Sequence, residues 1–270
     1  MKFNRKIASL LAQPWAIRAA SMAVMMEAFG YQHKAQGVEE MPMDDESEMY
    51  EVEDGIATIK ISGVIGKKLP GWMVEMFGMV DVDTISDMVR LANADASVRG
   101  IFLDIDSPGG TVSGVPEVAE TIRNSEKLVI GHTETLMASA GYWLGSGASG
   151  LFASSSALVG SVGVFIPVAD MRRMYEMAGV EMEIIKAGDL KGAAYPGTSL
   201  SQAQRDDFQR SVTHVKSKFD EFVTSRVGVN SIPASALQGQ DFYGDQALEV
   251  GLIDGLMSRA EAIEALKKLA

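Results

Sequence analysis

The fold class is decided by residues 101–110, which read IFLDIDSPGG. The first five residues form a nearly continuous apolar run, which is typical of a strand buried on both faces. The strand stops at Ser-Pro-Gly-Gly, because proline and glycine favour a tight turn. A buried strand that ends in such a turn and leads into a helical pattern indicates one βα unit of a parallel sheet.

Strand and helix patterns alternate on both sides of this stretch. We see no internal repeat, and the alternation predicts an α/β domain with a largely parallel sheet. Asp83 is the expected cap of the first helix. The predicted strands are 56–61, 101–105, 128–131, 151–153 and 181–186, and the predicted helices are 83–94, 113–124, one starting near 139, 168–178, 201–226 and two short ones at the C-terminus.

The 270 residues divide into three zones. Residues 1–38 are rich in Met and Ala, and their spacing predicts a helical N-terminal segment. Residues 39–54 hold nine acidic residues and no basic one. Such a run is typical of a solvated linker, and a docking tail for a basic partner is the alternative. Residues 55–270 carry the βα pattern and form the predicted domain.

The composition excludes several classes of protein. Hydrophobic residues make up 47% and charged residues 22%, as expected for a globular core. The lack of cysteine excludes disulfides, thiolate metal sites and a cysteine nucleophile. A net charge of −12 argues against nucleic acid as a partner. The uncharged run 135–169 is too rich in Ser and Gly to span a membrane, and no spacing of His, Asp and Glu predicts a metal or cofactor site.

The turn at residues 107–110 is the first candidate site. A glycine lets a backbone N–H point outward without a side chain in the way. An oxyanion hole requires such an N–H when a carbonyl becomes tetrahedral. An ordinary βα turn has the same sequence character, so the motif alone leaves both interpretations open. The turn is not a phosphate loop, because residues 106–110 fit neither GxxxxGK[ST] nor GxGxxG.

Ser139 is the second candidate, in the sequence MASAGYW of residues 137–143. Its small neighbours leave the hydroxyl accessible, and the N–H groups that follow it lie at the positive end of a predicted helix. A serine at this place is also a common N-cap. Both interpretations stay open on this residue alone.

A serine nucleophile needs a base. His33, His132 and His214 do not lie in loops suited to a catalytic triad, and we expect them to be structural or exposed. Lysine is the base in Ser–Lys variants of the triad, and it must be partly desolvated to be neutral near pH 7. Lys191 lies in a loop of small residues after a predicted strand. Its rivals are Lys186, Lys67 and Lys68.

Five segments together resemble the signal peptide peptidase A family, which are serine peptidases of the ClpP/crotonase fold. They follow the family's order and cover the chain from about Gly55 to its end. The resemblance implies a fold of repeated ββα units and serine endopeptidase activity without a cofactor. It also implies a homo-oligomer. The substrate would be a peptide or protein bound as an extended strand, with small or apolar side chains near the cleaved bond. The five segments are 101–110, 138–142, 158–164, 186–191 and 242–254.

The resemblance also implies the roles of individual residues. The serine of the family's Ala-Ser-x-Gly-Tyr motif is the nucleophile and maps to Ser139. The lysine of the later Gly-x-x-Lys loop is the general base and maps to Lys191. Ser161, in the Gly-Ser-x-Gly motif, would orient the lysine amine. The backbone N–H groups of the oxyanion hole map to Gly109 or Gly110 and to Ala140.

Residues 12–17, AQPWAI, are similar to the capsid (prohead) proteases of lambda-type phages. This similarity implies processing of capsid, portal or scaffold proteins during head assembly, in the host cytoplasm or the assembling prohead. No Gln- or Glu-rich stretch follows the domain in this sequence, so we expect the scaffold to be separate or absent. The alternatives are a cytoplasmic peptidase that degrades signal peptides, a non-catalytic assembly protein of the same fold, and a crotonase-type acyl-CoA enzyme, for which we find no signature.

Overall fold

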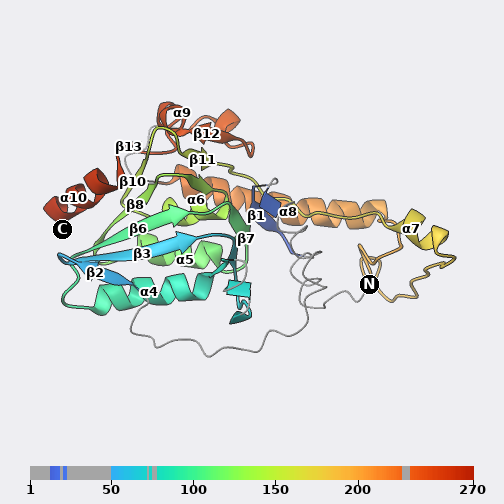
Figure 1. Cartoon of the computed structure of the whole chain (residues 1–270). Helices are drawn as coiled ribbons and strands as arrows, with labels where there is room; N and C mark the ends of the chain where they lie inside the picture. Colours follow the sequence, from blue (N-terminus) through green and yellow to red (C-terminus); the bar gives the residue numbers. More distant parts are fainter. Residues whose placement is uncertain (1–12, 19–20, 23–49, 72, 75–77, 227–231) are drawn as a thin grey trace.

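A six-stranded sheet forms the centre of the protein (Figure 1). The structure is a computed structural model that describes residues 13–18, 21–22, 50–71, 73–74, 78–226 and 232–270. Within this sheet every neighbouring pair is parallel except the last. In the order in which they lie side by side, its strands are β13 (Gly255–Leu256), β10 (Gly150–Ala153), β8 (Leu128–Thr133), β6 (Gly100–Asp106), β3 (Ile56–Ser62) and β2 (Glu51–Glu53).

Helices cover both faces of this sheet, which confirms the predicted α/β class. On one face, Ile101 and Leu103 of β6 join the main core with α4 and α5. On the other face, Phe102 packs with Leu266 of α10. This burial on both sides explains the apolar run in β6. The helices are α4 (Val82–Ala94), α5 (Val115–Arg123), α6 (Ala140–Gly145), α7 (Arg172–Met177), α8 (Gln202–Thr224), the short 3₁₀ helix η2 (Ala234–Ala236), α9 (Gly244–Glu249) and α10 (Arg259–Leu269).

Two smaller sheets lie beside the central one and position the candidate loops. The first has the order β1-β7-β4-β5 and the second the order β12-β11-β9. Strand β7 directly follows the turn after β6, and β9 directly precedes α6, so each candidate loop is fixed by a strand. The strands of these sheets are β1 (Trp15–Ile17), β7 (Gly109–Thr111), β4 (Ile65–Gly66), β5 (Val80–Asp81), β12 (Asp241–Tyr243), β11 (Leu158–Gly160) and β9 (Leu136–Ala138).

Three of the helices begin with a side-chain cap of the kind that local sequence signals predict. Helices α8 and α10 begin with capping boxes at Ser201 and Ser258, in which the serine hydroxyl and a side chain three residues later satisfy backbone N–H groups. The predicted cap of α4 is wrong by two residues. Asp81 is the cap, and its carboxylate accepts a hydrogen bond from the backbone N–H of Asp83 at 2.9 Å. None of the helices in the described ranges has the length and apolar character needed to cross a membrane.

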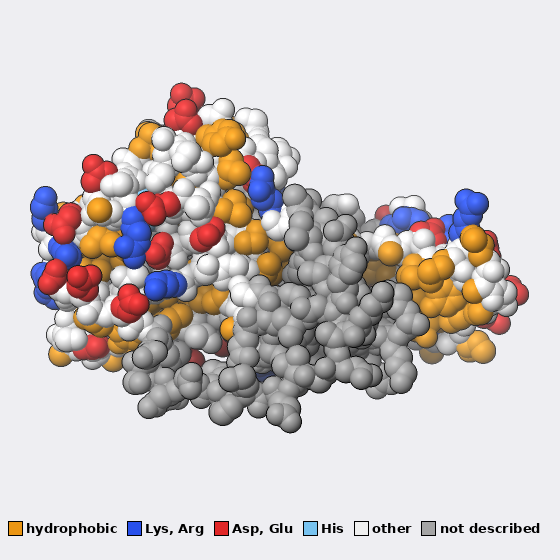
Figure 2. Space-filling view, viewed as in Figure 1, with side chains coloured by type: hydrophobic (Ala, Val, Ile, Leu, Met, Phe, Trp, Pro, Cys, Tyr) orange, Lys and Arg blue, Asp and Glu red, His pale blue; other side chains and the backbone are white. Residues whose placement is uncertain are grey.

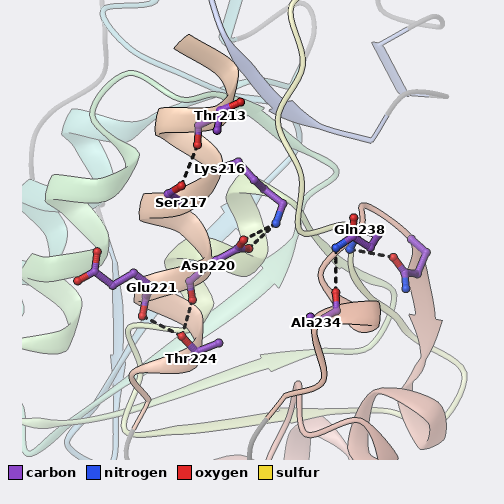
Figure 3. A network of polar contacts seen from close by, with 9 residues as sticks. Thr213, Lys216, Ser217, Asp220, Glu221, Thr224, Ala234 and Gln238 are labelled. Atoms are coloured by element: carbon purple, nitrogen blue, oxygen red, sulfur yellow. Dashed lines mark hydrogen bonds and ion pairs between the residues drawn. The ribbon is translucent and has the colours of Figure 1, made fainter. Parts of the chain in front are cut away.

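An arm, residues 167–201 with the outer end of α8, projects from the body of the molecule (Figure 1). The predicted strand at 181–186 is wrong, because these residues form neither strand nor helix. They are exposed or half-buried, and no strand among the described residues lies beside them to complete a ladder. Helix α8 carries its own polar contacts where it joins the body. In Figure 3, the Lys216 amine donates to both carboxylate oxygens of Asp220 at 2.5 Å, within one face of the helix.

The N-terminal zone differs from the sequence-based prediction at two places, although residues 21–22 are helical as predicted. Residues 15–17 form strand β1 instead of a helix, because they pair antiparallel with β7. At the end of the predicted acidic linker, residues 51–53 form β2, the edge strand of the central sheet. Residues 1–12 and 23–49 of the predicted helix and linker lie outside the described part of the chain.

Candidate active site

Ser139 lies at a strained junction between β9 and α6. Its φ of 56° and ψ of −118° are unfavourable for a residue with a side chain, and they turn the chain sharply from strand to helix. The same kind of strand–turn–helix elbow presents the nucleophile of many hydrolases. Ser139 is only 1% exposed, and its hydroxyl has no hydrogen-bond partner among the described residues. Ser139 is therefore held in a geometry that an N-cap alone does not require.

The turn after β6 is bonded directly to β9, the strand that ends just before Ser139. The backbone N–H of Ser107 donates to the carbonyl of Leu136 at 2.8 Å, and that of Ala138 donates to the carbonyl of Ser107 at 3.0 Å. The Ser107 hydroxyl donates to the Gly63 carbonyl at 2.7 Å. Ser107 thus ties the two candidate loops together. From the sequence, Ser107 is only the first residue of the SPGG turn, with no role of its own.

Gly109 faces Ser139 and the start of α6. A Cβ placed on Gly109 would lie 2.8 Å from the Ser139 Cβ and 2.8 Å from the Ala140 nitrogen. The Ala140 N–H belongs to the first turn of α6, where N–H groups have no partner within the helix. The Gly109 N–H donates to the Ser107 hydroxyl at 3.1 Å. Both glycines belong to β7: Gly109 lies opposite Ile17, whereas Gly110, the other predicted donor, lies between Ala16 and Ile65 of two neighbouring strands.

Ser161 lies next to a residue that is hydrogen-bonded to the backbone of Ser139. The N–H of Ser139 donates to the carbonyl of Gly160 at 2.8 Å, so Ser161 follows immediately after the contact. Its own N–H donates to the Gln240 carbonyl at 2.8 Å, and its hydroxyl donates to the Gly239 carbonyl at 3.3 Å. Ser161 also has a positive φ of 53°, which marks a second sharply turned position next to Ser139.

Lys191 is not brought to Ser139 within the single chain. It is exposed on the arm, where its backbone N–H donates to the Gly188 carbonyl at 3.1 Å. It lines a cavity formed by the arm and the start of α8, together with Tyr175, Ile184 and Gln204. Of its rivals, Lys186 is also on the arm and donates to the Asp189 carbonyl at 2.7 Å, whereas Lys67 is paired with Asp83.

The two histidines in the described ranges do not lie at the Ser139 elbow. His132 is buried on β8, with its Nε2 2.9 Å from the Met257 carbonyl and its ring stacked on Phe102. His214 is exposed on α8, and His33 lies outside the described residues. The described residues also contain no group of three His, Asp or Glu side chains that could hold a metal ion.

Buried polar groups brace the far side of α6. The Tyr142 hydroxyl donates to the Leu252 carbonyl at 2.7 Å, and burial raises the pKa of Tyr142 to about 12. Arg226 donates to the same carbonyl at 3.1 Å and to the Asp254 carboxylate at 2.7 Å. Trp143 stacks on Phe219 of α8 with ring centroids 4.3 Å apart. These contacts fix the helix that begins at Ser139.

Together, the sheets and the elbow define a chain of the ClpP/crotonase fold class with a serine at a strand–helix junction. A mutant of ClpP1 from Listeria monocytogenes has the same fold, with a TM-score of 0.50 at 13% identity over 76% of this chain and 94% of that one. The chain belongs to peptidase family S49, whose sequence profile matches residues 121–270. The fold and family expected from the sequence are therefore confirmed.

Two phage proteins are among the curated relatives. The chain is 29% identical over 220 residues to the head-tail preconnector protein GP5 of Enterobacteria phage P21, covering 81% of this chain and 44% of that protein. It is 28% identical over 220 residues to the capsid assembly protease C of Escherichia phage lambda, covering 81% of this chain and 50% of that protein. The chain spans about half the length of these relatives. A bacterial relative is Protease 4 of Haemophilus influenzae, 27% identical over 84% of this chain and 37% of that protein.

Proposed function

We propose that this chain is a serine endopeptidase with Ser139 as its nucleophile. The observation that carries the proposal is the strained elbow, which places the Ser139 side chain beside Gly109 and the first N–H of α6. A base takes the Ser139 proton as its oxygen attacks the peptide carbonyl, and the N–H groups of Gly109 and Ala140 bind the oxyanion. Each such donor lowers the barrier by about 3–4 kcal/mol. The Gly109 N–H would exchange its 3.1 Å bond to Ser107 for this oxyanion. The protonated base then gives this proton to the amine that leaves as the C–N bond breaks, and water hydrolyses the acyl-enzyme to free Ser139.

The proposed base is Lys191 supplied by a second copy of the chain. A lysine that acts as a base must be desolvated, and Lys191 is exposed in the single chain. The arm that carries it also exposes apolar side chains, which gather at the right-hand end of the molecule in Figure 2. Met177 is 81% exposed and Ile185 is 96% exposed, as expected for a surface that another copy covers. Ser161, next to the nucleophile, would then orient the incoming amine.

The proposed substrates are capsid, portal or scaffold proteins, cleaved as extended strands in the host cytoplasm or the assembling prohead. The similarity to the two phage proteins and the AQPWAI sequence support this proposal. Degradation of signal peptides is the second candidate. It is supported by the similarity to a putative signal peptide peptidase SppA of Enterococcus faecium, 29% identical over 64% of this chain.

The test combines active-site labelling with mixing of inactive variants. A fluorophosphonate probe reacts with an activated serine, and bound probe is read by intact mass. We expect labelling of the wild-type oligomer, none for Ser139→Ala, and none for Lys191→Arg, because a guanidinium cannot act as a base near neutrality. Lys186→Arg is the matched control on the same arm and should label like wild type.

Mixing Ser139→Ala with Lys191→Ala distinguishes a base from the same chain from one supplied by a second copy. If the base comes from a second copy, mixed oligomers contain intact Ser139–Lys191 pairs and regain labelling. Unchanged inactivity of the mixture, with each variant shown to assemble, would place the base in the same chain. Full labelling of Lys191→Arg would dismiss Lys191 altogether, and an assembled wild type that never labels would argue for the non-catalytic assembly protein.

A further inference from the structure

The N-terminal strand β1 is bonded along both of its edges. On one edge it pairs antiparallel with β7, and the Arg18 N–H donates to the Pro108 carbonyl at 2.8 Å. On the other edge, Trp15 and Phe165 exchange two backbone hydrogen bonds at 2.9 and 3.0 Å. Residues 14–18 therefore lie as an extended strand between two segments that would otherwise leave a gap one strand wide.

This strand runs directly past the nucleophile. A Cβ on Gly109 would lie 2.2 Å from the Ala16 carbonyl oxygen and 2.8 Å from the Ser139 Cβ, so a single glycine separates β1 from the serine. The Ser139 hydroxyl is buried and has no partner among the described residues. A hydroxyl in this state cannot meet a substrate carbonyl until something moves.

Side chains as well as backbone hold β1 in place. Trp15 and Ile17 are 1% and 4% exposed and pack in an apolar cluster with Met73 and Met79. At the end of the strand, the Arg18 guanidinium pairs with Asp241 of β12 at 2.5 Å. The pair is partly exposed, with side chains 34% and 20% accessible, so this ion pair can break without exposing the core.

We propose that β1 is a built-in occupant of the peptide-binding groove, which closes the Ser139 site until residues 14–18 leave it. The proposal rests on Ser139 as the nucleophile. An extended substrate needs strand edges beside the serine, and β1 uses the edge of β7 and the edge at Phe165 at once. A substrate strand and β1 therefore compete for the same backbone hydrogen bonds, and the closed state lowers the rate of reaction by the fraction of molecules in which the groove is filled.

A reversible clamp at the start of β1 tests this competition. The register that pairs Trp15 with Thr111 places Gln13 opposite Ser113, and the Ser113 hydroxyl already donates to the Gln13 side chain at 2.9 Å. Directly opposed residues of this kind in an antiparallel pair lie within the Cα separation that a disulfide accepts. The chain has no cysteine, so Gln13→Cys and Ser113→Cys introduce the only thiols in each copy, and non-reducing gel electrophoresis separates the intended intramolecular bond from links between copies.

The readout is the rate of fluorophosphonate labelling at Ser139 in the full-length oligomer, before and after reduction. We expect the oxidised clamp to label at least about tenfold more slowly than the same protein after reduction, since opening is blocked. Each single cysteine variant should label equally in both conditions. The double-cysteine protein carrying Ser139→Ala shows whether any probe reaches the new thiols.

A second variant acts in the opposite direction and leaves the strand sequence otherwise intact. Arg18→Ala removes the ion pair with Asp241. We expect labelling to become about two- to fivefold faster, the size of effect that loss of a partly exposed ion pair gives. Arg210→Ala, which removes the exposed pair with Asp207 on α8, is the matched control and should leave the rate unchanged.

Equal labelling rates in the oxidised and reduced clamp would overturn the proposal, because β1 would then be a permanent part of the sheet. Labelling that is absent in both states, and in wild type, would instead reject Ser139 as the nucleophile, and the occlusion with it. Labelling that depends on Ser139 but not on the clamp keeps the peptidase and removes only the occlusion.

Discussion

Gly109→Ala is the substitution that tests the geometry of the candidate site most directly. Gly109 has a φ of +94°, and an added Cβ would meet the Ala16 carbonyl oxygen at 2.2 Å and the Ala140 nitrogen and Ser139 Cβ at 2.8 Å. These atoms belong to the backbone or to a Cβ, so no side-chain rotation can relieve the contacts. The new methyl group must move the turn, β1 or the start of α6.

The expected loss of stability has two parts. A side chain at this φ costs about 1–2 kcal/mol, partly offset by about 0.4–1 kcal/mol because alanine reduces the freedom of the unfolded chain. Forcing a methyl group into packed surroundings adds about 1–3 kcal/mol. The free energy of unfolding should therefore fall by about 1–4.5 kcal/mol in total, a size seen when a core position is disrupted.

Gly239→Ala separates the two parts. Gly239 has nearly the same φ, +90°, but an added Cβ would have no atom within 4 Å. Urea denaturation of both variants should show a loss of about 1 kcal/mol or less at Gly239, which is the backbone part alone. Equal losses at the two positions, within about 0.5 kcal/mol, would refute the claim that Gly109, Ser139 and β1 share one small space.

Two further predictions concern the support of α6. Trp143→Ala should lower the free energy of unfolding by about 3–5 kcal/mol, because it removes the stack on Phe219 that joins α6 to α8. Leu269→Ala, at a 71% exposed position, is the control. In the same urea series it should change the free energy of unfolding by less than about 0.5 kcal/mol. Burial raises the pKa of Tyr142 to about 12 from 10.0, so the folded state holds this proton more tightly. This contribution to the free energy of unfolding is fully present below pH 10. It is lost as the pH rises from 10 towards 12, and the loss is about 3 kcal/mol in all. Tyr142→Phe should abolish this loss in pH-dependent unfolding, and an unchanged alkaline transition would contradict it.

Much of the site could be anticipated because its chemistry is local. The strand and turn at residues 101–110 form as predicted, and Ser139 stands at the junction of β9 and α6. The role of Ser107 could not be read from the sequence, because its partner Leu136 lies in another strand. Contacts between strands far apart in the chain depend on the register of the whole sheet.

The failed predictions share a physical cause. Residues 15–17 follow a helical composition, yet they form a strand because β7 and Phe165 offer unpaired backbone groups on both sides. Residues 181–186 follow a strand pattern, yet they form none because no described strand lies beside them. Strand formation depends on a partner more than on intrinsic preference.

Local pattern was enough to predict the α/β class, the glycine turn and the serine at the start of a helix. Hydrophobic period, glycine and proline determine the conformation of residues close to them in the chain. Three matters were decided only by the tertiary structure: that Gly109 faces Ser139, that β1 lies beside them, and that Lys191 stands apart on an exposed arm. Each depends on which distant segments meet, and that is chosen by the burial and hydrogen bonding of the whole chain rather than by any short stretch of it.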